Sequence, residues 1–331
     1  MEQGLYPLKF IPLFKKKIWG GSKIKNLLNI DFSPLENCGE LWSLSAVEGE
    51  ETLIENGFLQ EATIKEAIDM YSDELMGEEN FERFYNEFPL LFKIIDAADN
   101  LSLQVHPDDK YAQTKGFSNG KNEMWYIINA ENNAKITSGF RKKVTKAEIL
   151  NSIRDNKLMD IVNCEQAFED DVFFIPAGRI HAIGKGIMLA EIQQSSDLTY
   201  RLFDYNRTDK NGNKRELHLQ DAMNVIDLSP IHDTAKEHYH NHLNHTHNII
   251  DTPFFSTNIM NLNMQSGLKK DYSKLESFVV YFCIGGCAEV HALNTVLHIT
   301  SGETLLLPAI TKEVVVYPQG NAKILEVTIL S

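Results

Sequence analysis

A short stretch before the middle of the chain, residues 101–106, alternates strictly between apolar and polar side chains. The two alternating sets are Leu101, Leu103 and Val105, and Ser102, Gln104 and His106. Because side chains of a β-strand point to opposite faces in turn, this pattern predicts a strand with one apolar and one polar face. A hydroxyl, an amide and an imidazole then share one face, which is typical of a strand that lines a cavity. Pro107 ends the strand, since it has no N–H for a central ladder.

Two further side chains of the kinds that bind metal ions lie in strand-like segments downstream. Glu123 follows a turn and begins an apolar run, and His181 follows a strand and a tight turn within 171–184. Two imidazoles and one carboxylate, from His106, Glu123 and His181, form a ligand set that keeps an open position, as catalytic zinc sites do. The same set suits non-haem Fe²⁺, so the residues alone leave both metals open.

Several blocks of the chain resemble the type I phosphomannose isomerases. The most specific are Gln-Val-His-Pro-Asp-Asp at 104–109, Gly-Lys-Asn-Glu-Met-Trp-Tyr at 120–126 and Pro-Ala-Gly-Arg-Ile-His-Ala at 176–182. Further matches lie at 19–21, 39–43, 92–96 and 191–201. The resemblance runs from about Leu5 to Arg207 and is weaker over the C-terminal third, where the chain departs from the longer members. Members of this family are zinc-dependent mannose-6-phosphate isomerases built on the cupin jelly roll, and this chain has the length of the shorter bacterial form.

The resemblance implies a metal site and a reaction. It implies that one Zn²⁺ per chain is bound by Gln104, His106, Glu123 and His181. It also implies that a small sugar phosphate is the substrate, with mannose 6-phosphate and fructose 6-phosphate interconverted through a cis-enediol. With a single carboxylate among the ligands, the site keeps a charge near +1, which favours an enediolate.

The resemblance further implies roles for residues around the metal. Arg201 is expected to be a second electrophile, because a guanidinium is permanently charged and can hold two oxygens. Ser102 and Lys93 are expected to bind the phosphate. Three other residues resemble those of the family's substrate pocket: Trp19, Glu40 and Asp197.

The catalytic base has several candidates. Glu191 alternates with apolar neighbours and is expected to face the cavity, and Lys121 is expected to point the same way as Glu123. A metal-bound water or a histidine ligand could also accept the proton. All four alternatives stay open at this point.

The charge of the chain excludes some partners. Its formal net charge is −14, which disfavours nucleic acid and anionic membranes. A sugar phosphate therefore needs a local positive field, which Lys93, Lys121, Arg201 and a divalent metal would supply. No apolar run is long enough for a transmembrane helix, and the N-terminus does not resemble a secretory signal, so we expect a cytoplasmic protein. The oligomeric state is left open.

Short strand-like runs predict a mainly β fold, a β-sandwich or jelly roll with helical insertions at about 60–88 and 145–163. The resemblance implies that this is a cupin jelly roll. Capping-box spacings support helices that begin after Thr63 and after Thr145. Shorter helices are expected over 81–88, 158–162 and 217–226.

The pattern divides the chain into three parts. We expect a catalytic domain over 1–230, a histidine-rich linker over 231–250 and a smaller jelly roll over 251–331. The segment 301–309 echoes 170–177 but is followed by no counterpart of His181, so the second jelly roll is expected to lack metal ligands.

The segment 232–247 holds six of the eleven histidines. Such a tract is either a metal-binding segment or a solvated linker. The four cysteines form no disulfide or metal framework and are expected to be buried thiols.

Two other functions remain as alternatives to the isomerase. A cupin oxygenase would use Fe²⁺ at His106, Glu123 and His181, but it would not need Lys93, Ser102 and Arg201 around the site. A sugar-phosphate sensor would bind the same ligand without turning it over.

Overall fold

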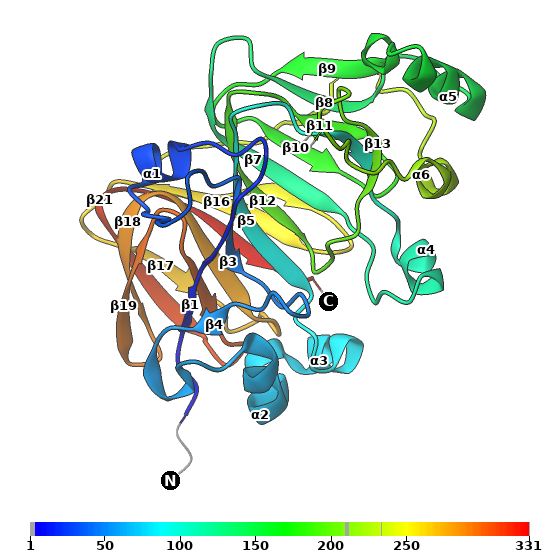
Figure 1. Ribbon diagram of the computed structural model, residues 1–331. Coiled ribbons are helices and arrows are strands. Elements are labelled where there is room, and N and C mark those ends of the chain that lie inside the picture. Colours follow the sequence, from blue (N-terminus) through cyan, green and yellow to red (C-terminus); the bar gives the residue numbers. More distant parts are fainter. Residues whose placement is uncertain (1–3, 209–211, 233, 331) are drawn as a thin grey trace.

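The structure is a computed structural model that describes residues 4–208, 212–232 and 234–330. Within these residues the strands form three antiparallel sheets of nine, seven and five strands, and short helices lie at the edges (Figure 1). The predicted mainly β architecture is confirmed. None of the described helices is long and apolar enough to cross a membrane. The four cysteines are free; Cys38 and Cys283 are buried as expected, whereas Cys164 and Cys287 are only half-buried.

The seven-stranded sheet is built, in order, from β14 (Lys236–Glu237), β10 (Val172–Ile175), β7 (Glu123–Ala130), β12 (Ile187–Gln194), β5 (Leu90–Ala97), β3 (Glu40–Leu44) and β2 (Leu13–Lys15). The five-stranded sheet is built from β13 (Tyr200–Phe203), β6 (Leu103–Val105), β11 (His181–Ile183), β8 (Lys135–Phe140) and β9 (Val162–Gln166).

The nine-stranded sheet contains β15 (Thr246–Asp251), β16 (Ser256–Leu262), β21 (Glu313–Thr328), β18 (Val279–Ala292), β20 (Thr304–Leu307), β1 (Leu8–Ile11) and β4 (Leu53–Ile54), with β17 (Leu268–Asp271) on β21 and β19 (Thr295–Thr300) on β18.

The seven-stranded sheet lies between the other two. On β5, Phe92 and Ile94 pack into a core shared with the nine-stranded sheet, whereas Ile95 and Ala97 pack toward the five-stranded sheet. Side chains alternate in the same way on β7 and β12. All residues of β5 and β12 are buried, as expected for strands covered on both faces.

The helices are α1 (Lys23–Leu28), α2 (Ile64–Met76), α3 (Glu78–Phe84), α4 (Asp109–Thr114), α5 (Lys146–Arg154) and α6 (Leu219–Val225), with single turns η1 (Gly57–Leu59) and η2 (Leu158–Asp160). Both predicted capping boxes are present, at the starts of α2 and α5. The helix expected over 158–162 is only the turn η2, because the chain pairs as β9 from Val162. Sequence analysis did not predict α4, whose N-cap Asp108 accepts a hydrogen bond from the Tyr111 N–H.

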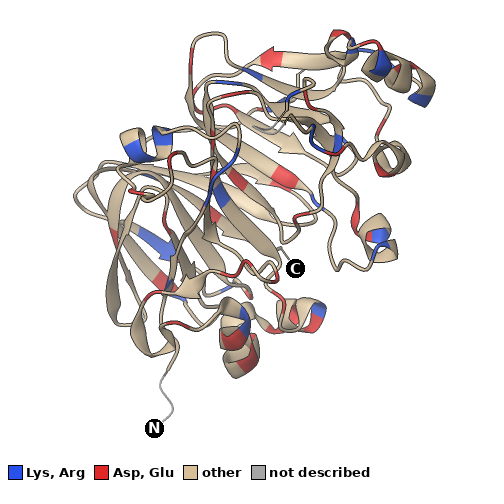
Figure 2. Ribbon diagram, in the orientation of Figure 1, with Lys and Arg blue, Asp and Glu red and all other residues tan. Residues whose placement is uncertain are grey.

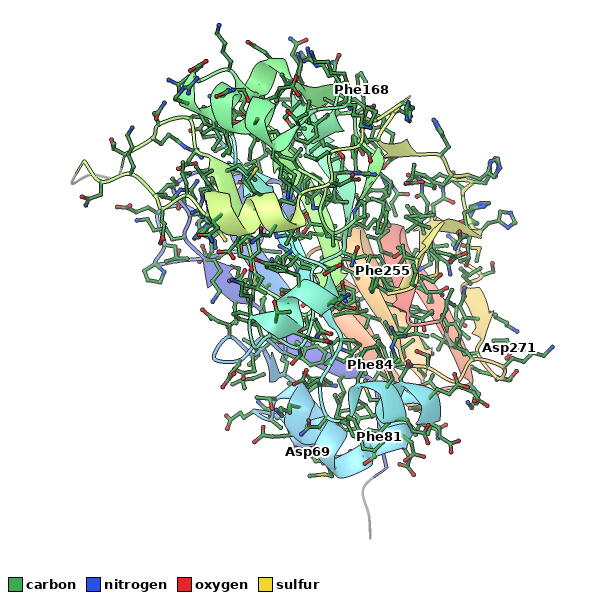
Figure 3. The ribbon with its side chains drawn as sticks, turned by 90° about the vertical axis from the view of Figure 1, so that its right-hand side faces the viewer. Asp69, Phe81, Phe84, Phe168, Phe255 and Asp271 are labelled. Carbon is green, nitrogen blue, oxygen red and sulfur yellow. The ribbon has the colours of Figure 1, made fainter. Side chains whose placement is uncertain are left out.

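The second predicted helix, over 81–88, spans Glu78–Phe84 instead. Gly77 precedes it with a φ of 87°, a conformation that favours glycine, so α2 ends there and α3 begins directly. Phe81 and Phe84 of α3 pack against the core that the nine- and seven-stranded sheets share, and Phe255 is part of that core (Figure 3).

Strand pairing connects the two ends of the chain. β1 pairs with β20 and with β4, so N-terminal residues complete the sheet formed mostly by residues after 245. The segment 231–250, expected to be a linker, contains β14 and most of β15. The domain boundaries at 230 and 250 stay predictions.

Candidate metal centre and active site

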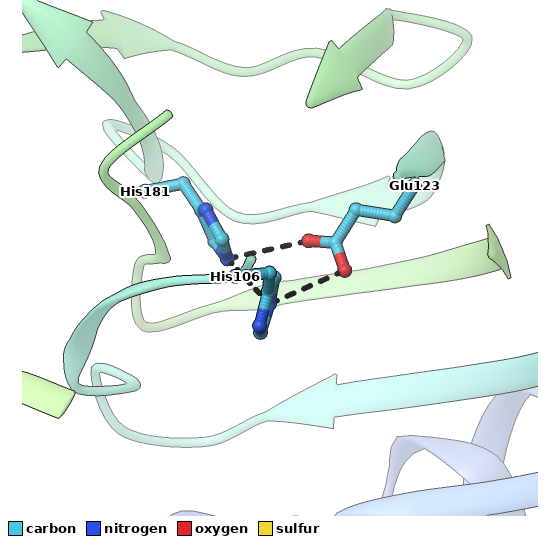
Figure 4. A group of neighbouring side chains, drawn as sticks. All are labelled: His106, Glu123 and His181. Carbon is cyan, nitrogen blue, oxygen red and sulfur yellow. Dashed lines mark hydrogen bonds and ion pairs between the residues drawn. The ribbon is translucent and has the colours of Figure 1, made fainter. Parts of the chain in front are cut away.

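Three ligand-type side chains meet between the seven- and five-stranded sheets. His106 follows β6, Glu123 begins β7 and His181 begins β11. The Nε2 atoms of His106 and His181 lie 3.1 Å apart, and they lie 3.5 and 3.3 Å from the two carboxylate oxygens of Glu123 (Figure 4). Within the described part of the chain, these three residues place their ligand atoms within 4.8 Å of one another.

Backbone carbonyls orient both imidazoles. Nδ1 of His106 lies 2.7 Å from the carbonyl oxygen of Leu198, and Nδ1 of His181 lies 2.8 Å from that of Arg179. A carbonyl can only accept, so each Nδ1 carries the proton and each Nε2 keeps its lone pair, which is the usual arrangement of metal-binding histidines. The Gly178 N–H donates to the His106 carbonyl, and this contact holds the two histidine-bearing segments together.

The carboxylate of Glu123 is the least satisfied group of this cluster. The side chain is fully buried, and neither oxygen has a hydrogen-bond partner. Burial raises the pKa of Glu123 to about 8, and burial lowers the pKa of His181 to about 3. Lys121 Nζ is the nearest cationic side-chain atom, 3.3 Å from one Glu123 oxygen. A buried carboxylate and two neutral imidazoles that converge in this way suit a divalent cation, whose charge would satisfy all three groups.

Gln104 lies beside the cluster. Its amide is 3.3 Å from Nε2 of His181, and rotation of the amide by half a turn exchanges its oxygen and nitrogen without moving the side chain. The structure therefore brings all four expected ligands together, with the amide oxygen available as the fourth.

A polar cavity of about 300 Å³ opens next to the cluster. The residues expected to bind the substrate or to act in catalysis line this cavity, together with the expected ligand Gln104: Trp19, Glu40, Lys93, Ser102, Gln104, Lys121, Glu191, Asp197 and Arg201. Three further polar residues that sequence analysis missed also line it: Lys17, Thr199 and Arg215. Lys17 lies just before the Trp-Gly-Gly match, which could have indicated it. Arg215 lies beyond the end of the resemblance, so the sequence carried no signal for it.

Most charges in the cavity are paired. Lys93 lies 3.1 Å from Glu191 and donates to Gln193, and Lys17 lies 3.1 Å from Glu40. Basic and acidic positions are adjacent on the central strands (Figure 2). Burial alone would raise the pKa of Glu191, but Lys93 and Lys121 with the Trp125 N–H hold it at about 2. Burial likewise opposes the charge on Lys93, and Glu191 nevertheless raises its pKa.

Arg201 differs from the lysines. Its Nε lies 3.3 Å from Ser102 Oγ and its Nη1 donates to the Glu216 carbonyl, and the described residues offer it no carboxylate within ion-pair distance. Arg215, by contrast, is paired with Asp204. Arg201 is therefore the cavity guanidinium whose charge is not offset locally, and Ser102 contacts it directly.

A β-sandwich that encloses two histidines and a glutamate beside such a cavity belongs to the cupin class of β-proteins. The family model for the catalytic domain of type I phosphomannose isomerase matches residues 8–126. The chain is 34% identical over 308 residues to mannose-6-phosphate isomerase ManA of Bacillus subtilis (strain 168), covering 91% of this chain and 93% of that protein. It therefore belongs to the type I phosphomannose isomerase family, a family of enzymes.

Other relatives agree with this assignment. A mannose-6-phosphate isomerase of Streptococcus mutans is 38% identical over 226 residues, 67% of this chain and 68% of that protein. The solved mannose 6-phosphate isomerase from Bacillus subtilis superposes with a TM-score of 0.84 at 28% identity and covers 97% of this chain and 99% of that one.

Proposed function

We propose that this chain is a zinc-dependent enzyme that interconverts mannose 6-phosphate and fructose 6-phosphate. The observation that carries the proposal is the buried His106–Glu123–His181 cluster, whose ligand atoms converge within 4.8 Å of one another, beside a cavity lined by several lysine and arginine side chains. The relatives at 34% and 38% identity are named mannose-6-phosphate isomerases, which supports this choice of substrate. A sugar phosphate carries about −1.5 to −2 charges and does not diffuse through membranes, so we place the enzyme in the cytoplasm.

The metal ligands in this proposal are Gln104, His106, Glu123 and His181. Bound Zn²⁺ would supply positive charge that polarises the sugar carbonyl and its neighbouring hydroxyl. The carbonyl contacts at Nδ1 keep both rings neutral and pointed inward. One carboxylate among the four ligands leaves that positive charge largely uncancelled.

Two parts of the cavity are proposed to hold the substrate's negative charge. We assign Arg201 to the oxygen that becomes negative in the cis-enediol, because its charge is not offset by a carboxylate. We assign the phosphate to Ser102 and Lys93. The ion pair of Lys93 with Glu191 reduces the field that the lysine can contribute, so Arg201 is expected to matter more for the rate.

The proton that moves between C2 and C1 needs a base. Both imidazoles direct Nε2 at Glu123 and use Nδ1 for carbonyls, which argues against a ligand histidine. Burial opposes the charge on Glu191, but Lys93, Lys121 and Trp125 outweigh it and lower its pKa below the usual range, and a more acidic carboxylate is a weaker base. Lys121, 3.3 Å from Glu123 and facing the cavity, remains the candidate that the chain itself supplies.

A coupled assay for fructose 6-phosphate tests the proposal. The purified protein should convert mannose 6-phosphate, lose the activity after chelation and dialysis, and regain it with one equivalent of Zn²⁺. Oxygen consumption that depends on Fe²⁺, without any isomerisation, would instead indicate a cupin oxygenase. Binding of mannose 6-phosphate by the zinc-loaded protein without turnover would indicate a sensor.

A further inference from the structure

Four histidines in the segment expected to be a linker form a second imidazole cluster. They are His240, His242, His245 and His247, and His247 is in ring contact with the other three. Its ring centroid lies 5.1 Å from that of His242, 6.1 Å from that of His245 and 6.5 Å from that of His240. The rings of His240 and His242 lie 5.9 Å apart. None of these residues contributes to the cavity described above.

The backbone beneath the cluster is held in place by the nine-stranded sheet. Asn244 turns the chain with a φ of 65°, and its N–H donates to the Asn261 carbonyl at 2.7 Å. Its side-chain amide donates to Asn263 at 2.9 Å. His247 follows on β15 and pairs with Ile259 of β16. The four imidazoles are thus carried by an ordered turn and strand rather than by a free tail.

His247 offers a nitrogen that could bind a metal. Its Nε2 is buried and has no hydrogen-bond partner, and its backbone is fixed in β15. An imidazole nitrogen that is not engaged in a hydrogen bond can donate its lone pair to a metal ion.

The spacing of the rings is close to what one bound ion requires. A Zn–N bond is about 2.1 Å, so two imidazoles on a tetrahedral ion have centroids about 5 Å apart. In this structure the four rings do not yet direct their nitrogens at one point, since the described residues hold only the His106–Glu123–His181 set within 4.8 Å. His240, His242 and His245 are exposed, so their rings can rotate toward Nε2 of His247 without disturbing a core.

We propose that His240, His242, His245 and His247 form a second metal site, which binds one late first-row divalent cation such as Ni²⁺, Zn²⁺ or Cu²⁺. Neutral imidazole is a favoured ligand of these ions. The site is separate from the proposed catalytic centre and does not depend on the isomerase activity.

The test is a Ni²⁺ titration of the full chain, without an affinity tag and with its first equivalent of Zn²⁺ already bound. We expect calorimetry to show one further Ni²⁺ per chain, while elemental analysis shows that the zinc is retained. The variant His240→Ala/His242→Ala removes two exposed rings and should lose this equivalent. His247→Gln should weaken the binding as well, because it removes the ring that contacts the other three.

The matched control is His232→Ala/His238→Ala, which removes two exposed histidines of the same tract that make no ring contact with the cluster. It should bind Ni²⁺ as the parent does. The proposal is overturned if the parent binds no further ion, or if both double variants lose binding equally, since the tract would then act only through its number of histidines. Melting curves and isomerase assays should match the parent for both double variants.

Discussion

The two faces of the seven-stranded sheet are equally buried but chemically opposite. On β5 and β12, the face toward the nine-stranded sheet carries Phe92 and Ile192, whereas the face toward the five-stranded sheet carries Lys93 and Glu191. Burial of apolar side chains stabilises the fold directly. Burial of charges costs free energy that pairing recovers only in part. The charged face is therefore explained by chemistry at the site rather than by stability.

The charged face is tolerable because most of its groups are paired by the register of the sheet. Lys93 and Glu191 are directly opposite each other on β5 and β12. Glu191 is also opposite Trp125 on β7, and its carboxylate accepts a hydrogen bond of 2.8 Å from the Trp125 indole N–H. Glu123 is less well satisfied, since neither of its oxygens has a hydrogen-bond partner and only Lys121, at 3.3 Å, offsets its charge. The difference between the two faces is therefore one of chemistry, because only the charged face holds groups that could bind an ion or a charged ligand.

The largest effect is expected from loss of a histidine that faces Glu123. His106→Ala should remove the metal and lower the turnover by at least about a thousandfold, because the positive charge at the sugar oxygens is lost. Metal content and the coupled assay measure the two effects. His291→Ala, on the nine-stranded sheet, is the control and should change neither. Full activity of the His106 variant would remove the basis for the metal centre.

Arg201→Ala should have the next largest effect. The loss of a charge held next to a developing oxyanion is expected to lower kcat by about 10²–10³. The metal content should stay at that of the parent, which separates this effect from that of His106→Ala. Arg154→Ala, at an exposed position on α5, serves as the control. An unchanged kcat would contradict the role assigned to Arg201.

The paired charges should appear in the dependence of stability on pH. The pKa of Glu191 falls from 4.5 to about 2, since Lys93 and Lys121 outweigh its burial. As the pH falls, Glu191 is therefore protonated in the unfolded chain before it is protonated in the folded chain. The resulting stabilisation is complete above pH 4.5 and is lost as the pH falls from 4.5 to 2, in total about 3 kcal/mol.

Urea unfolding of the metal-free protein at pH 5 and pH 3 measures this loss. Glu191→Gln should be less stable at both values, because Lys93 is left buried without its partner. The variant should nevertheless lose less stability between the two values than the parent does. An identical loss in the parent and the variant would show that the ion pair contributes nothing to acid stability.

The apolar face should show the smallest effect, and only on stability. Ile192→Val removes one buried methylene-sized group next to Glu191 on the same strand and should cost about 1 kcal/mol. Urea unfolding measures this cost, and kcat and KM should equal those of the parent. A marked fall in kcat would show that the two faces are not functionally separate.

Local patterns in the sequence were reliable where the interactions are themselves local. The capping boxes at Thr63 and Thr145 join residues three apart, and both helices begin where predicted. The alternation over 101–106 corresponds to a shorter strand, β6 (Leu103–Val105), and Ser102 and Gln104 line the cavity as expected. The helix expected over 158–162 is shortened to the single turn Leu158–Asp160, because pairing of β9 with β8 begins at Val162.

Contacts between distant residues could not be read from the chain. The sequence grouped Ser102 with Lys93, yet the structure couples Ser102 to Arg201 and Lys93 to Glu191. Arg215 reaches the cavity from outside the matching blocks. Each of these contacts depends on which strands become neighbours and in which register, and no local spacing specifies that.

The amino-acid sequence by itself determined the β character of the chain, the starts of its two predicted capped helices and the set of side chains able to bind a metal. Strand alternation and capping depend on neighbours a few residues away, so they are present in the sequence before any folding. Only the tertiary structure decided which charges are paired and which stay unbalanced, because β5, β7, β12 and the five-stranded sheet must meet before these side chains share one buried space.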